Sequence, residues 1–121
     1  MRRLAILAAS AILVAGMSGP AMADDGAKLF VTNGCVRCHG ANGEGKKAKG
    51  APKIAGCEAA RKQGRLEDPS LDGCIGFISK QARAIKSGNF PKNPTRRMMR
   101  VAIEAVSGED IEEIAKWLAS K

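Results

Sequence analysis

The stretch GCVRCHG, residues 34–40, contains two of the chain's four cysteines and its one histidine. A pair of thiols in a CxxC arrangement is typical of a redox-active pair, of half a zinc site or of a structural disulfide. The imidazole of His39 directly follows the second thiol. None of these three interpretations accounts for a histidine at that position.

Each of the three simpler interpretations lacks something that it needs. A zinc site requires four protein ligands, and the chain has no second close-spaced pair of Cys or His residues. A thioredoxin-like pair belongs near a strand–helix unit, and no strand pattern is visible in the sequence. A plain disulfide would leave His39 without a role.

CxxCH is instead the attachment pattern of a c-type haem. The thiols of Cys35 and Cys38 are spaced to form thioethers with the two vinyl groups on one edge of the porphyrin. His39 then lies where one ring nitrogen can ligate the iron, while its other nitrogen needs an acceptor that fixes the ring. The sequence therefore predicts one covalently attached haem c.

The first 23 residues have the pattern of a cleaved signal peptide. A basic start, MRRL, precedes the apolar run LAILAASAILVAG and the small-x-small sequence AMA at residues 21–23. The apolar run fits the roughly 7–15 residues of a signal peptide and falls short of the ~18 of a membrane helix. We expect cleavage before Asp24, export to the periplasm and no membrane span afterwards; an uncleaved anchor is the alternative.

Composition predicts a basic domain with a small core. Without residues 1–23, the chain keeps 18 basic and 12 acidic side chains, a formal charge of +6. Its aromatic residues are few: Phe30, Phe77, Phe90 and Trp117. A domain of this size is marginally stable on its own apolar core, so a flat apolar cofactor would help to fill the interior.

The apolar periodicity predicts an all-α chain. Helices are expected over 25–33, ending at Gly34, over 73–88, ending at Gly88, and over 108–121, where Ser107 is the N-cap. Residues 41–52 are rich in Gly and Lys and predict an exposed loop, and residues 89–95 predict a turn-rich connector.

These segments, in this order, resemble the class I c-type cytochromes over residues 24–121. The resemblance rests on GAKLFVTNGCVRCHG at 26–40, APKIAG at 51–56 and SGEDIEEIAKWL at 107–118; FISKQARAIKSGNF at 77–90 is similar to small bacterial members. It implies one haem domain in which the first and last helices cross, with Gly26 allowing close approach to the helix that carries Trp117. It also implies that the Pro52 carbonyl accepts a hydrogen bond from His39.

The resemblance further implies a methionine as the second axial ligand of the iron. After signal cleavage only Met98 and Met99 remain. Counting back from Ile111, the first inward aliphatic of the last helix, gives Met99, and Met98 is its rival. The alternative is that both fill the core, as single methionines usually do.

Cys57 and Cys74 depart from the usual pattern of that family. They bracket a polar segment, EAARKQGRLEDPSLDG at 58–73, that reads as an insertion. In an exported chain this pair predicts a structural disulfide. A redox-active pair or a second metal site is the alternative, although nothing near either thiol would obviously lower its pKa.

Seven of the 18 basic residues lie in two segments. They are Lys46, Lys47, Lys49 and Lys53 after the haem motif, and Arg96, Arg97 and Arg100 around the methionine pair. The resemblance places both segments near the haem edge, where they would steer an acidic redox partner. A cationic surface that only serves solubility is the alternative. The export pattern and the lack of a base-reading motif exclude nucleic acid as a partner.

The sequence thus predicts a soluble periplasmic monohaem carrier of single electrons, ligated by histidine and methionine. We expect no enzyme, because no acid–base or nucleophilic constellation is present. The alternatives are the electron-accepting haem subunit of a specific dehydrogenase, and a ligand-binding sensor, which would need an open sixth position on the iron.

Overall fold

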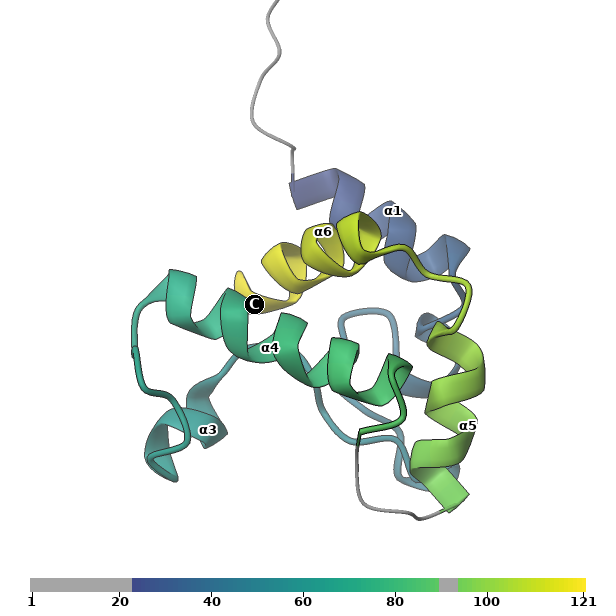
Figure 1. The fold of residues 1–121 in the computed structure, drawn as a ribbon, viewed down its shortest axis with the longest axis horizontal. Helices are drawn as coiled ribbons and strands as arrows, with labels where there is room; N and C mark the ends of the chain where they lie inside the picture. Colours follow the sequence, from purple (N-terminus) through teal and green to yellow (C-terminus); the bar gives the residue numbers. More distant parts are fainter. Residues whose placement is uncertain (1–22, 90–93) are drawn as a thin grey trace, which may run out of the picture.

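The computed structural model describes residues 23–89 and 94–121 (Figure 1). Its elements are α1 (Ala23–Thr32), α2 (Val36–His39), the 3-10 helix η1 (Lys47–Lys49), α3 (Glu58–Lys62), α4 (Leu71–Lys86), α5 (Pro94–Ile103) and α6 (Gly108–Ala119). Within the described residues the only β-type pairing is an isolated bridge between Lys46 and Ala51. The all-α prediction is confirmed. The predicted signal peptide lies almost entirely outside the described residues.

The C-terminal helix α6 forms as its sequence predicts. The Ser107 hydroxyl accepts a hydrogen bond from the Asp110 N–H at 3.1 Å, which satisfies one of the free donors at the helix start. Acidic side chains in the first turn suit the positive end of the helix dipole. The buried face of the helix comprises Ile111, Ile114, Ala115, Trp117 and Leu118.

Helices α1 and α6 pack closely because a glycine lies at their contact. A Cβ added at Gly26 would lie 2.4 Å from the Glu113 carbonyl oxygen and 2.5 Å from Trp117 Cβ. Beside it, the rings of Phe30 and Trp117 pack with centroids 5.1 Å apart and planes tilted by 48°. Such tilted aromatic pairs contribute beyond the area they bury. The contact implied for Gly26 is thus present in the structure.

Helix α4 begins earlier than the apolar pattern indicated. It starts at Leu71, where the Ser70 hydroxyl accepts a hydrogen bond from the Gly73 N–H at 3.2 Å. It ends before Gly88, whose φ of +80° belongs to the left-handed region that glycine adopts without strain. Ile85 joins the core near this end.

A polar cluster ties α4 to the start of α6. The Ser79 hydroxyl is buried and donates to Glu112 Oε2 at 2.7 Å, while Arg83 Nε donates to the Ser79 oxygen at 3.1 Å. Arg83 also donates to the Gly108 carbonyl at 3.0 Å. Burying the Ser79 hydroxyl without a hydrogen-bond partner would cost free energy of folding, so the bond to Glu112 is kept in the folded protein. These hydrogen bonds therefore set the alignment of α4 against α6.

Helix α5 differs from the sequence prediction. The turn-rich connector expected over 89–95 gives way to a helix at Pro94, a residue well suited to a first helical position. Both methionines lie on this helix. The apolar pattern of the sequence did not reveal this helix, because arginines flank the methionines and Ile103 is the one buried apolar side chain among residues 96–103. Residues 90–93 of the connector lie outside the described residues.

The insertion after the Pro52 loop is held by a disulfide. Cys57 and Cys74 are both buried, and their sulfur atoms are bonded across a Cα–Cα distance of 5.8 Å. The Arg65 guanidinium lies 5.2 Å from the centroid of the Phe77 ring, which adds a cation–π contact between the insertion and α4. Figure 1 shows α3 beside the start of α4, at the end of that helix opposite α5.

Candidate haem site

The CxxCH motif folds as a single helical turn. The His39 N–H donates to the Cys35 carbonyl at 2.9 Å, and Cys35 itself has helical dihedral angles. Residues three and four apart share one side of a helix, so the two thiols and the imidazole start from the same side of the turn. Gly40, with a φ of +82°, ends the turn. This local geometry suits a group bound by all three side chains.

His39 is oriented through its ring. The side chain is buried, with 6% of its surface exposed, and Nδ1 lies 3.0 Å from the Pro52 carbonyl oxygen. A carbonyl oxygen can only accept, so Nδ1 carries the proton and donates it. The lone pair then lies on Nε2, which is the tautomer that a metal-ligating histidine needs. The hydrogen bond implied by the resemblance is present in the structure.

The loop that presents Pro52 is built from backbone hydrogen bonds. Lys46 and Ala51 pair in both directions, at 3.0 and 3.2 Å, so the chain doubles back on itself around η1. Gly43, which is buried, accepts a further bond from the Ile54 N–H at 2.9 Å. The segment predicted as an exposed loop is therefore ordered around the Pro52 carbonyl.

The two thiols of the motif have different surroundings. Cys35 is half-buried and packs against the hydrophobic core, and this burial is the main cause that raises the pKa of its thiol. Cys38 is exposed. Neither is in a disulfide. Cys57 and Cys74 lie in the contexts GCEAA and GCIGF, so neither belongs to a CxxCH motif. Cys35 and Cys38 are therefore the cysteines whose thiols remain free.

The structure separates the two methionines. Met99 is half-buried and packs against the hydrophobic core, whereas 68% of the Met98 surface is exposed. Adjacent residues on a helix point about 100° apart, so one of the two faces inward and the other faces solvent. The inward position favours Met99 as the ligand candidate.

The apolar surroundings fit a porphyrin. Around the buried core lies a set of half-buried apolar side chains drawn from the haem motif, the Pro52 loop, α4 and α5. They are Cys35, Val36, Ile54, Ile78, Ala82 and Met99. Half-buried apolar side chains of this kind suit contact with a porphyrin, and an imidazole, two thiols and a thioether are the donor types that hold a c-type haem.

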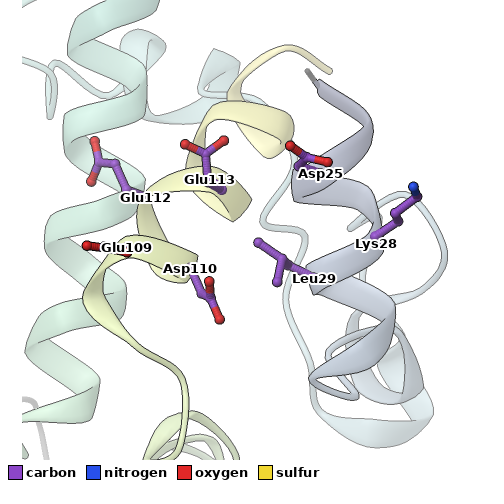
Figure 2. A pocket seen from close by; sticks show the side chains of 7 residues that line it. All are labelled: Asp25, Lys28, Leu29, Glu109, Asp110, Glu112 and Glu113. Carbon is purple, nitrogen blue, oxygen red and sulfur yellow. The ribbon is translucent and has the colours of Figure 1, made fainter. Parts of the chain in front are cut away.

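A crevice of about 630 Å³ between α1 and α6 is a different feature (Figure 2). Asp25, Lys28 and Leu29 of α1 line it together with four carboxylate side chains of α6: Glu109, Asp110, Glu112 and Glu113. None of the haem-motif residues lines this crevice. Across the described part of the chain, no group of His, Cys, Asp and Glu side chains is arranged to hold a metal ion.

The lysines predicted to face a partner are at the surface. Lys46, Lys47, Lys49 and Lys53 are exposed, as are Arg97 and Arg100, while Arg96 is half-buried. Lys46 Nζ donates to the Arg37 carbonyl at 3.3 Å. This bond links the residue before η1 to the haem motif. The basic segment and the motif are thus neighbours.

Sequence reasoning did not single out Gly45. Its N–H donates to the His39 carbonyl at 2.7 Å, and its φ is +86°. The spacing of Gly40, Gly43 and Gly45 in one short loop was the available indication, since closely spaced glycines often mark a backbone that must pass near another.

No helix among residues 23–89 and 94–121 has the length and apolar character that crossing a membrane would take. No curated protein and no solved structure was found to match the chain. A family model described as cytochrome c matches residues 23–121, which include the haem motif, the Pro52 loop and the terminal helix. The chain therefore belongs to the cytochrome c family, whose members bind covalently attached haem c and transfer electrons.

Proposed function

We propose that this protein is a soluble periplasmic monohaem electron carrier whose iron is ligated by His39 and Met99. When bound, the haem supplies one-electron chemistry between ferrous and ferric iron. Cys35 and Cys38 hold it through thioethers. We further propose that residues 24–121 form the mature domain after cleavage of residues 1–23, and that the protein transfers electrons without turning over a substrate.

The observation that carries this proposal is the state of His39. The ring is buried, follows both thiols directly and donates its Nδ1 proton to Pro52, which leaves Nε2 for the iron. A carbonyl that accepts the Nδ1 proton fixes the orientation of a ligating imidazole and raises its basicity. A histidine that only filled the core would not need two thiols on the same helical turn.

Met99 supports a carrier over a sensor. With haem bound, His39 and the Met99 thioether would both hold the iron, and thioether ligation would raise the reduction potential of a carrier. Met99 packs against the hydrophobic core, which limits the movement of its side chain. A sensor would need the sixth position of the iron open to an external ligand.

The partner proposed is a redox protein with an acidic docking surface. The exposed lysines of the loop that follows the haem motif would steer such a partner toward the haem edge, and salt would weaken the effect. The same charges would not suit a partner with a basic face.

The experiment is a spectroelectrochemical titration of the purified protein, combined with its intact mass. We expect one reversible one-electron transition, and a mass that exceeds the mature polypeptide by one haem that acid organic solvent does not extract. The variants Cys35→Ala and Cys38→Ala should each impair haem attachment. An extractable haem would contradict the thioethers, and a transition with no reversible one-electron step would contradict the carrier.

A further inference from the structure

Gly45 lies between the backbone of His39 and the peptide that accepts the His39 ring proton. Its N–H donates to the His39 carbonyl at 2.7 Å. A Cβ added at Gly45 would lie 2.7 Å from the Lys53 nitrogen, 2.8 Å from the Pro52 carbonyl carbon and 2.9 Å from the Ala51 oxygen. All three are backbone atoms, so a side chain at Gly45 would have to displace the peptide after Pro52.

That peptide has little room to yield. Residues 46 and 51 are bonded to each other in both directions, which fixes the two arms of the loop side by side. The oxygen of the same peptide, the Pro52 carbonyl oxygen, lies 3.0 Å from His39 Nδ1. A shift of the peptide away from Gly45 therefore changes the one hydrogen bond that orients the imidazole.

We propose that Gly45 is a positioning residue for the haem ligand: the absence of a side chain lets the Pro52 carbonyl stay within hydrogen-bond distance of His39 Nδ1. The inference rests on the proposed role of His39 as an iron ligand. A strong bond at Nδ1 makes the imidazole a better electron donor, which favours ferric iron. A displaced Pro52 carbonyl would weaken that bond and favour ferrous iron.

The test uses Gly45→Ala and Gly45→Asn in the haem-loaded protein. Both add the Cβ, but asparagine tolerates a positive φ better than alanine, so backbone strain differs between them while the steric contact does not. We expect both to raise the reduction potential and to speed exchange of the His39 Nδ1 proton with solvent, measured by NMR.

Gly64→Ala is the matched control. Gly64 also has a positive φ, of +66°, but an added Cβ there would meet nothing within 4 Å, and it lies in the insertion between α3 and α4. This variant should lose stability from backbone strain and leave the potential and the Nδ1 exchange rate at their wild-type values.

Three results would overturn the inference. One is a wild-type potential and exchange rate in both Gly45 variants with haem attached. Another is the same shift in Gly64→Ala. If neither Gly45 variant accumulates, the wild-type protein still decides: a slowly exchanging Nδ1 proton supports the inference, and one that exchanges as in free imidazole refutes it. A failed carrier proposal would look different, since the wild type itself would then lack a reversible one-electron transition.

Discussion

At the scale of single residues, Met98 and Met99 give a direct comparison of two neighbouring side chains. Met99→Ala should open the sixth position of the iron, lower the reduction potential and allow cyanide to bind, because the inward thioether is removed. Absorption spectra recorded with and without cyanide would measure this. Met98→Ala should leave the spectrum unchanged.

The Met98→Ala variant should also keep almost the full stability of the wild type. With 68% of its surface exposed, Met98 loses little packing on truncation, and the free energy of unfolding should change by no more than about 0.5 kcal/mol. If Met98→Ala lost the sulfur-ligated spectrum while Met99→Ala kept it, Met98 would be the ligand. That result would refute the assignment of Met99, which rests on its burial.

At the scale of helices, the close contact between α1 and α6 depends on Gly26, which has no side chain. Gly26→Ala should destabilise the fold by about 1–3 kcal/mol, since the new Cβ would overlap the Glu113 carbonyl and Trp117. Gly76→Ala is the matched control, because Gly76 lies in α4 with open space around it. That variant should gain about 0.5–1 kcal/mol from helix propensity.

Denaturant unfolding of the two glycine variants would measure both changes. If both variants changed the free energy of unfolding by the same amount, helix propensity alone would explain the effect of each substitution. That result would contradict a close contact between α1 and α6 at Gly26.

The disulfide allows a second test at this scale. Replacing both Cys57 and Cys74 by Ala should lower the free energy of unfolding by about 3 kcal/mol, on the chain-entropy account of a loop this long. The reduction potential should stay unchanged, since the insertion lies at the end of α4 opposite α5 (Figure 1). A large shift in potential, or two titratable thiols in native protein without reductant, would refute a purely structural bridge.

Elements with a strong apolar period were predictable from the sequence, and those without one were not. The helices containing Phe30, Ile85 and Ile111 follow from periodicity and their stop or cap residues, and the haem motif from its spacing. Helix α5 was missed because its core contact reduces to Met99 and Ile103, flanked by arginines. The loop at 41–52 and its hydrogen bond from His39 to Pro52 were predicted, but the backbone pairing of Lys46 with Ala51 was not, because backbone hydrogen bonds leave no pattern in side chains.

At the scale of the whole molecule, charge is distributed unevenly. Exposed lysines follow the haem motif, whereas carboxylates line the crevice between α1 and α6 (Figure 2). The double variant Lys47→Glu/Lys49→Glu should slow electron transfer to a carboxylate-coated electrode, because the steering attraction is lost. The difference from wild type should shrink as ionic strength rises.

Lys28→Glu/Lys116→Glu is the control for that experiment. It makes the same change in net charge at one residue of α1 and one of α6 instead of in the basic loop, and should affect the rate far less. Equal slowing by both double variants would mean that only total charge matters, and that the lysines serve solubility.

The central claim is that His39 and Met99 both ligate the haem iron of an electron carrier. The most direct measurement is the visible spectrum of the oxidised wild-type protein, at the red end, where a sulfur-to-ferric-iron band appears in methionine-ligated haem. We predict a weak band there that persists on brief exposure to cyanide. A spectrum without that band, in a protein that binds cyanide freely, would contradict the claim and favour a haem with an open sixth position.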